Sequence, residues 1–316
     1  MLDIIKKKDP TSTIMMRKFF VTQFSKRYGY VKRLCNKSII ENDCFASEQS
    51  SVGIIASLDY TGPITKNQFH GSPVPYRFFE FKTNSEKLKG FLEWLSNVTS
   101  SVIFQPIYNS DPNIPSFWFN LYIKTAYAKG AKWAVGNIRR DKDLFDSLDE
   151  YSKKYFKTDD GFIESFLSGP VNLDRLKTLY LRTFTDMKGI TSDLDASISR
   201  ILADGLSAGW NPKKIAYGIS NSIDTIGKYR ATILARTEII RAHHLASVQT
   251  YRDAGIDGVK VLAEWTTARD SRVCDRCRSL DYKATGKLWS LDTIEGLIPL
   301  HPQCRCAALP ATMFSA

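Results

Sequence analysis

Four cysteines and one histidine near the C-terminus have the types and spacing of metal ligands. They are Cys274, Cys277, His301, Cys304 and Cys306. A CxxC turn lets two thiolates face one point, and the HxxC sequence that begins at His301 supplies two more ligands from a second turn. The spacing therefore predicts a tetrahedral zinc site.

Five candidate ligands compete for the four positions of such a site. We expect Cys274, Cys277, His301 and Cys304 to bind the zinc, with Cys306 as an alternate ligand that could replace His301 in a four-cysteine site. A closed shell of four ligands leaves no position for water or substrate, so this zinc would be structural, and its binding would contribute folding free energy. Two alternatives stay open, which are metal-free packing of these side chains in a reduced domain and a disulfide.

The length and composition predict a globular chain with more than one domain. At 316 residues the chain is too long for one ordinary core, which suggests two or three domains. Hydrophobic residues make up 43% and charged residues 24%, which argues against wholesale disorder. The net charge of +11 permits an anionic partner such as nucleic acid.

No sequence feature predicts secretion or a membrane span. The opening residues, MLDIIKKKDP, carry charges where a secretory signal needs an apolar run, and no stretch approaches eighteen unbroken apolar residues. We therefore expect a cytoplasm-like compartment and no membrane partner. In reducing surroundings, clustered cysteines are metal ligands or plain thiols more often than disulfides.

The basic excess is concentrated at the N-terminus. Residues 1–34 hold nine basic and two acidic residues. On a helix expected over residues 11–40, these charges form either a solvated face or a surface that contacts phosphates. The candidate nucleic-acid contacts are Lys18, Lys26, Arg27, Lys32 and Arg33.

Periodicity elsewhere predicts a mainly helical body followed by a short β-containing region. We expect helices over 116–140, 141–156 and 228–254. Residues 173–209 are also expected to be helical, with helix stops at Gly189 and Gly209. A further helix is expected to begin after Asn211, which is its predicted N-cap. Another helix is expected from Asn84, with Asn84 or Ser85 as its cap, and residues 157–172 have the composition of a linker. Residues 53–58 and 76–81 are candidate strands.

The C-terminal region has strand patterns around the cysteines. Residues 258–267 alternate as a half-buried strand, Gly286 could turn a short hairpin, and residues 304–309 suggest a final strand. The predicted fold class is α+β, with a mainly helical body and a small C-terminal Cys/His-rich domain that contains the strands. The expected domains are a basic mixed domain (1–110), a helical domain (111–235) and a C-terminal domain (236–316).

Three separated motifs occur together in a fixed order. They are ARTEIIRAHHLA (235–246), EWTTARDSRVCDRC (264–277) and PLHPQCRC (299–306). With the helical stretch from about Leu173, they make roughly the last 145 residues resemble the Mu F-like head-morphogenesis proteins, which are minor head proteins of tailed bacteriophages. Many members have Leu-Asp-Gly after the CxxC, where this chain has Leu280, Asp281 and Tyr282.

The resemblance implies a virion component present in few copies and no enzymatic activity. Such a protein is made in the host cytoplasm, assists head morphogenesis and capsid assembly, and is located in the phage head. The implied partners are the portal protein, the major capsid protein, or both, together with phage DNA bound without sequence specificity. A part in DNA delivery is also implied.

Two other classes of function compete with this one. A metal-dependent nuclease needs an open coordination position and a general base, yet the chain has no HExxH and no HxE beside a CxxC. Glu264 and Asp270 are the carboxylates that lie just before Cys274. A cellular zinc-ribbon nucleic-acid binder should carry a strong positive charge, but residues 258–316 hold eight basic and six acidic residues.

Overall fold

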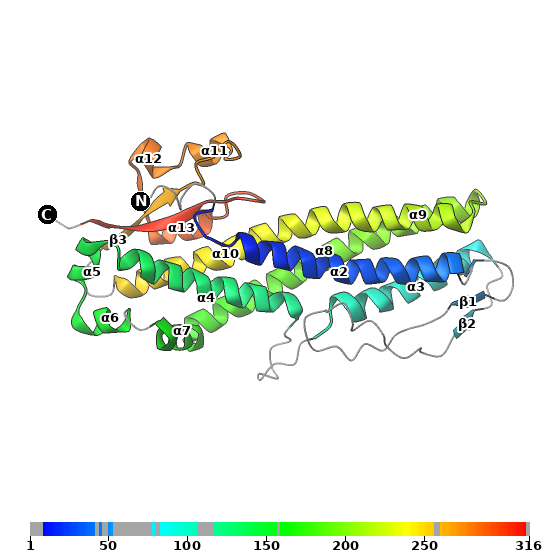
Figure 1. Ribbon diagram of the computed structural model, residues 1–316, viewed down its shortest axis with the longest axis horizontal. Coiled ribbons are helices and arrows are strands. Elements are labelled where there is room, and N and C mark those ends of the chain that lie inside the picture. Colours follow the sequence, from blue (N-terminus) through cyan, green and yellow to red (C-terminus); the bar gives the residue numbers. More distant parts are fainter. Residues whose placement is uncertain are drawn as a thin grey trace. The chain divides into compact units, whose positions relative to one another are not determined.

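The chain folds into long helices and a small antiparallel sheet, so its fold class is α+β (Figure 1). The computed structural model describes residues 9–41, 44–45, 50–52, 77–79, 83–106, 117–156, 159–255 and 260–313. The candidate strand at 53–58 lies outside the described residues, whereas part of the second candidate forms β2 (Arg77–Phe79), which pairs with β1 (Ser50–Val52).

Helices account for most of the described chain before residue 256. They are α2 (Ile14–Asn36) with a π-helical turn at Lys37–Glu41, α3 (Asn84–Ile103), α4 (Trp118–Ile138), α5 (Lys142–Ser147), α6 (Glu150–Tyr155), α7 (Asp159–Ser168), α8 (Pro170–Ser207), α9 (Pro212–Ser222) with a π-helical turn at Ile223–Gly227, and α10 (Lys228–Ala254). No helix in the described ranges combines the length and the apolar character needed to cross a membrane.

Contacts within the chain define two compact units, each built from separate segments. The first unit contains Met1–Lys18, Asn120–Thr183 and Ile233–Ala316, and the second contains Phe19–Phe119 and Phe184–Thr232. The boundaries between the units fall within helices, because α2, α4, α8 and α10 each contribute residues to both units. The three consecutive domains expected from the sequence stay a prediction.

Local sequence signals placed several helix ends correctly. Asn211 caps α9, because its side chain accepts a hydrogen bond from the Lys214 amide at 2.9 Å, and Pro212 occupies the first turn. Gly209 adopts a left-handed conformation (φ 62°) after α8, as expected of a helix stop. Gly189 does not stop a helix, because α8 continues through it from Pro170 to Ser207.

Two further expectations about helix ends were wrong. Thr83, and not Asn84 or Ser85, caps α3, since its side chain accepts from the Glu86 amide while the Glu86 side chain accepts from the Thr83 amide. Much of the predicted linker at 157–172 is helical, because it contains α7 and the start of α8. Phe162 and Phe166 of α7 are buried, which explains why this segment folds.

Helices α4 and α10 approach each other closely in the first unit at Gly130. A Cβ on Gly130 would lie 2.8 Å from the Cα and the carbonyl carbon of His243. The Ser247 hydroxyl also donates hydrogen bonds to the carbonyls of Gly130 and His243, at 3.0 and 2.8 Å. Only glycine fits this backbone-to-backbone contact.

The substitution Gly130→Ala should therefore destabilise the protein. We expect the free energy of unfolding in urea to fall by about 1–3 kcal/mol, because the added methyl group meets backbone and must push the helices apart. Gly189→Ala is the matched control, since nothing lies within 4 Å of the Cβ it would add inside α8. That control should stabilise by up to about 1 kcal/mol through helix propensity. Equal effects of the two substitutions would show that the close approach is incorrect.

The C-terminal sheet has three antiparallel strands in the order β4-β3-β5. They are β3 (Lys260–Thr266), β4 (Leu288–Ser290) and β5 (Ala307–Met313). The strand predicted over 258–267 is confirmed for its described part. It is more than half-buried, because Leu262 and Thr266, on the face opposite Ala263 and Trp265, are also buried.

Helix α10 supports this sheet through a shared apolar core. Ile240 and Val248 of α10 pack in one cluster with Trp265, while α13 (Leu291–Leu297) adds Ile294. Tyr251 of α10 donates a hydrogen bond to the Ala308 carbonyl of β5 at 3.2 Å. The metal-ligand candidates Cys277, Cys304 and Cys306 belong to the same cluster. The site is therefore part of a core and not an appendage.

Candidate metal centre

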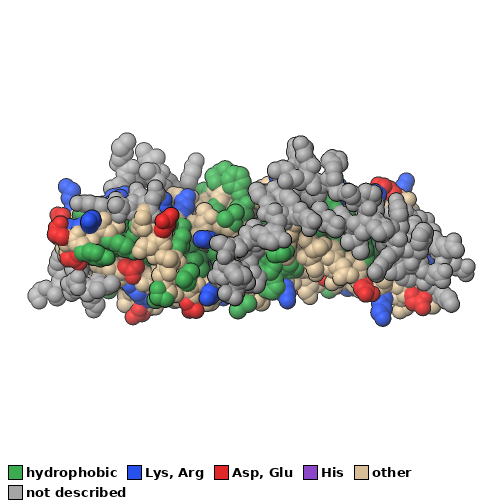
Figure 2. All heavy atoms as spheres, turned by 90° about the horizontal axis from the view of Figure 1, so that it is seen from below, with side chains coloured by type: hydrophobic (Ala, Val, Ile, Leu, Met, Phe, Trp, Pro, Cys, Tyr) green, Lys and Arg blue, Asp and Glu red, His purple; other side chains and the backbone are tan. Residues whose placement is uncertain are grey.

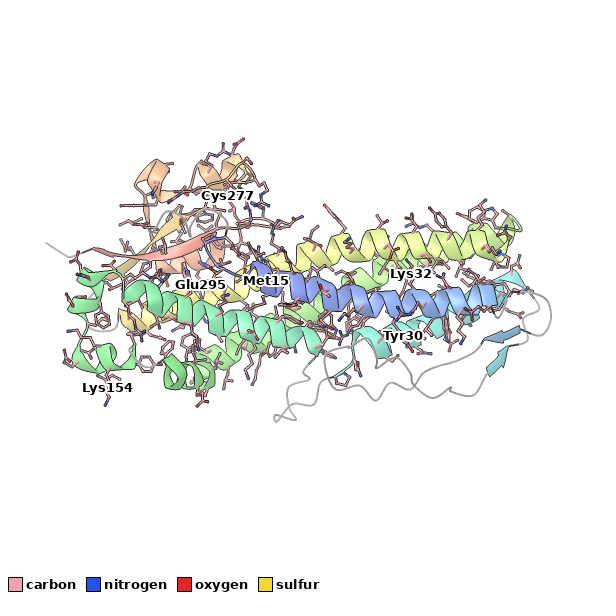
Figure 3. All side chains as sticks on the ribbon, viewed as in Figure 1. Met15, Tyr30, Lys32, Lys154, Cys277 and Glu295 are labelled. Carbon is pink, nitrogen blue, oxygen red and sulfur yellow. The ribbon has the colours of Figure 1, made fainter. Side chains whose placement is uncertain are left out.

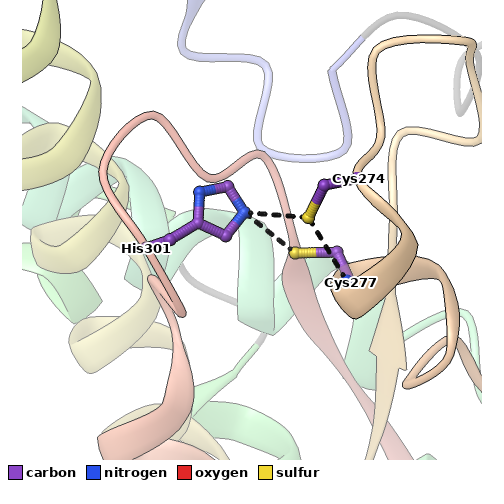
Figure 4. A group of neighbouring side chains, drawn as sticks. All are labelled: Cys274, Cys277 and His301. Carbon is purple, nitrogen blue, oxygen red and sulfur yellow. Dashed lines mark hydrogen bonds between the residues drawn. The ribbon is translucent and has the colours of Figure 1, made fainter.

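The CxxC segment forms a tight turn at the start of a short helix, α11 (Asp275–Arg278). Cys274 is the N-cap residue, and its Sγ accepts a hydrogen bond from the Cys277 amide at 3.4 Å. This backbone N–H lowers the pKa of the exposed Cys274 thiol. The turn aims the Cys274 sulfur and the buried Cys277 sulfur toward His301 (Figure 4).

The HxxC segment forms a second turn that α10 holds in place. The Cys304 amide donates to the His301 carbonyl at 3.1 Å, and Gln303 between them has a positive φ of 65°. The Gln303 amide donates to the Thr237 hydroxyl at 3.3 Å, while its side-chain oxygen accepts from Arg236 at 2.9 Å. The first and third sequence motifs are therefore joined at Gln303.

Three distances between candidate ligands are close to those of a tetrahedral site. His301 Nε2 lies 3.4 Å from Cys274 Sγ and 3.1 Å from Cys277 Sγ, and the Sγ atoms of Cys277 and Cys304 are 4.0 Å apart. Tetrahedral zinc with its ordinary bond lengths separates two sulfurs by about 3.8 Å and a sulfur from a nitrogen by about 3.6 Å. Cys274, Cys277 and His301 are therefore close enough together to share one metal ion.

The histidine has the tautomer that a metal ligand needs. His301 Nδ1 lies 2.8 Å from the Pro302 carbonyl oxygen, which can only accept, so Nδ1 carries the proton. Nε2 then presents its lone pair to the thiols of Cys274 and Cys277. A carbonyl partner on the far nitrogen is the usual outer support of a metal-bound histidine.

The structure gathers the five candidates as two overlapping trios. One contains Cys274, Cys277 and His301, and the other contains Cys277, Cys304 and Cys306, with all ligand atoms of a trio within 4.8 Å of one another. The expected set of four does not meet that criterion, so at least one distance from Cys304 to Cys274 or His301 exceeds 4.8 Å. These Cys and His groups could hold a metal ion, and Cys277 is common to both trios.

The three buried thiols cannot all ionise without a cation. Hydrogen bonding within the trio lowers the pKa of Cys304, whereas it raises the pKa of Cys306 and raises the pKa of Cys277 to about 12. One thiolate is thus stabilised by protonated neighbours. A bound divalent ion is the agent that deprotonates coordinating thiols outright.

A buried aspartate shapes the loop that leads into the CxxC turn. Asp281 accepts hydrogen bonds from the amide and hydroxyl of Thr267, at 2.9 and 2.6 Å. Burial would raise the pKa of Asp281, but the bonds from Thr267 and Arg269 lower it. Asp281 also caps α12 (Tyr282–Thr285), which ends at Gly286 (φ 65°). The hairpin expected at Gly286 was wrong, because this glycine is the C-cap of α12 and β4 pairs with β3, which ends at Thr266.

Asp270 is occupied by two arginines. It forms ion pairs with the buried Arg305 and with Arg272, and the bond from Arg305 is the main reason that the pKa of Asp270 lies well below its ordinary value. A carboxylate with so low a pKa is a weak general base. The final strand was expected to begin at residue 304, but β5 begins only at Ala307, and Arg305 therefore lies in the preceding loop.

The adjacent histidines of the first motif are both buried and point to different partners. His244 Nε2 lies 2.9 Å from the Ile294 carbonyl oxygen of α13 and donates to it. The His243 ring packs on Trp133 of α4, with centroids 5.2 Å apart. Neither belongs to either trio of ligand atoms. His244 therefore attaches α13 to α10, while His243 fills the contact between α10 and α4.

The candidate nucleic-acid contacts on α2 have different environments. Lys18, Lys26 and Arg33 are exposed. Lys32, labelled in Figure 3, forms an ion pair with Asp224 at 2.5 Å. Arg27 is 1% exposed and its guanidinium lies 4.4 Å from the centre of the Trp118 ring, so we remove it from the candidate phosphate contacts.

Figure 2 shows one face on which the described basic side chains stand singly among acidic ones. No continuous basic stripe is visible among the side chains coloured there. Phosphate contacts from basic residues of this kind would carry no sequence information.

The fold and the site together define a class of protein, a helical body whose C-terminal sheet and α10 enclose a Cys/His cluster. The family model described as phage Mu protein F like protein matches residues 196–309, so this region is similar to that family. The match contains all three motifs and begins further along the chain than Leu173, where we expected the likeness to start. No curated protein and no solved structure matches the chain.

Proposed function

We propose that the protein is a minor head protein of a tailed bacteriophage that acts in head morphogenesis beside the portal or the major capsid protein. The family match over residues 196–309 carries this proposal. The contacts in the first unit support it, because they join motifs that lie within the matched residues. Gln303 binds Arg236 and Thr237, while His244 binds the Ile294 carbonyl.

The Cys/His cluster is proposed to hold one structural zinc ion. Cys274, Cys277 and His301 supply three ligands, and Cys304 completes the shell because its Sγ is the next sulfur from Cys277 at 4.0 Å. Cys306 stays a protonated, buried neighbour. With four protein ligands, the ion stabilises the sheet and leaves no position for a substrate.

The head role is tested with a nonsense mutation in the gene, in the phage or prophage that encodes it. We expect lysates without the protein to contain aberrant or few heads by electron microscopy, and a plasmid copy of the gene to restore them. Mass spectrometry of purified particles should find the protein in heads. Normal yields of infectious particles that lack the protein would contradict the proposal.

The exposed basic residues of α2 are proposed to contact phage DNA without sequence specificity. We expect the double substitution Lys26→Gln and Arg33→Gln to weaken duplex binding and to reduce the slope of log affinity against log salt by about 2. The reason is that each phosphate contact releases about one counterion from the DNA, and this release is lost with the contact. The measurement is a fluorescence-anisotropy titration at several salt concentrations.

The matched control is Lys213→Gln with Lys214→Gln, which removes two charges from α9. An unchanged slope in the α2 variant, or an equal change in both variants, would show that α2 is not the DNA surface.

A further inference from the structure

Four arginine side chains from distant parts of the sequence meet in the first unit beside the Cys/His cluster. Arg272 and Arg305 bind the same carboxylate oxygen, Asp270 Oδ2, at 3.0 and 2.6 Å. Arg236 binds Gln303, two residues before Arg305. Burial lowers the pKa of Arg236, and the positive charges of Arg17, Arg305 and Arg272 lower it further.

This group keeps an excess of positive charge. Two carboxylates face the four guanidinium groups, since Asp270 pairs with Arg305 and Arg272 while Asp9 pairs with Arg17 at 2.6 Å. Asp9 is itself 5% exposed and also accepts from Thr13. With both carboxylates ionised, the group carries a net charge of 4 − 2 = +2.

One nitrogen of the group needs an acceptor. The Arg17 side chain is only 9% exposed, and its Nη1 is buried without a hydrogen-bond acceptor among the described residues. A buried donor without an acceptor is costly, and a charged one is more costly still. An anion that reached Arg17 would satisfy this nitrogen and reduce the repulsion among the four arginines.

We propose that Arg17, Arg236, Arg272 and Arg305 form a binding site for a phosphate-class oxyanion. Guanidinium groups present paired N–H donors that match phosphate oxygens, and several of them together bind it better than separate lysines do. The Arg272 side chain is 68% exposed and Arg236 is half-buried, so the anion enters past these two residues. Asp9 binds Nη2 of Arg17, and Asp270 binds both terminal nitrogens of Arg305, which holds these two side chains in position.

The anion is either free phosphate or a phosphate of a nucleic-acid backbone, which share this chemistry. The site stands on the arginine geometry alone and does not depend on the role in head assembly. A failure of phosphate to bind would not contradict the proposed role in head morphogenesis. Likewise, normal particles without the protein would not contradict the phosphate site.

The test is a calorimetric titration of the full chain with inorganic phosphate at constant ionic strength, for the wild type, Arg236→Gln and Arg272→Gln. We expect saturable binding by the wild type and about tenfold weaker binding by each variant, because each loses a charged hydrogen-bond donor. Lys142→Gln is the matched control, since it removes one exposed charge from α5 of the same unit and should bind as the wild type does. Metal content is measured in every variant to show that the neighbouring turn is intact.

Displacement of phosphate by a short duplex would assign the site to a DNA backbone, whereas phosphate binding unaffected by the duplex would assign it to the free ion. No saturable phosphate binding, or equal affinity in the wild type and both arginine variants, would overturn the proposal. Loss of metal from the variants without any phosphate binding would also overturn it, because the arginines would then only balance the charge of the thiolates.

Discussion

Cys277→Ser should release the metal and open the C-terminal sheet. Cys277 is the ligand shared by both trios, and it is buried in the core cluster that joins α10 to β3. Structural zinc contributes about 10–16 kcal/mol to the folding of small zinc peptides, so loss of a ligand should lower the stability of this region by several kcal/mol, on the order of 5. We expect proteases to cleave after residue 255 in the variant and to leave the wild type intact.

Cys306→Ser is the matched control, because Cys306 is equally buried but stands outside the proposed ligand set. It should keep its metal and its protease resistance, apart from a modest loss of packing. A chelator should make the wild type behave as Cys277→Ser does and should change that variant no further. If Cys306→Ser loses the metal while His301→Ala keeps it, the shell contains four cysteines and the proposed set is wrong.

Acidification should destabilise the protein strongly between pH 7 and pH 5. Burial lowers the pKa of His243 to about 3 and the pKa of His244 to about 4. In the unfolded chain both have a pKa near 6.5, so between these values the unfolded state binds more protons. The stability is therefore complete above about pH 6.5 and is lost as the pH falls through the window down to about 4. At pH 5 each histidine should cost about 2 kcal/mol, which gives about 4 kcal/mol for the pair.

His243→Phe isolates this effect from protonation of the metal ligands. Phenylalanine keeps a ring against Trp133, and it removes a buried nitrogen, Nε2, that has no acceptor among the described residues. In urea denaturation at pH 5 and pH 7.5, the variant should lose about 2 kcal/mol less than the wild type on acidification. An identical loss in both proteins would mean that His243 is protonated in the folded state or is not buried.

Helices were predictable where a local signal acts over a few residues. Asn211 and Pro212 start α9 as expected because cap chemistry depends only on adjacent residues. Gly189 failed as a stop because the buried face of α8 on either side, with Met187 and Ile190 inside, outweighs the cost of one glycine in a helix. The low helix propensity of one residue does not end a helix when the residues on both sides of it are packed in the core.

In the candidate site, too, features set by neighbouring residues were predictable, and contacts between distant residues were not. Spacing alone predicted that Cys274, Cys277 and His301 lie together, because CxxC and HxxC each form a turn, whereas the structure groups Cys304 with Cys277 and Cys306. The support from α10 was not predicted, since the contacts of Gln303 with Arg236 and Thr237 join residues more than sixty positions apart. The arginine group was missed for the same reason, because Arg17 lies at the other end of the chain and its charge had been assigned only to a helix surface.

The most direct test of the central claim is the metal content and coordination of the purified full chain, expressed with zinc supplied. Elemental analysis should find one zinc per chain, and X-ray absorption should show three sulfur ligands at about 2.3 Å and one nitrogen at about 2.0 Å. Protein that is folded and protease-resistant without any bound metal would contradict the account.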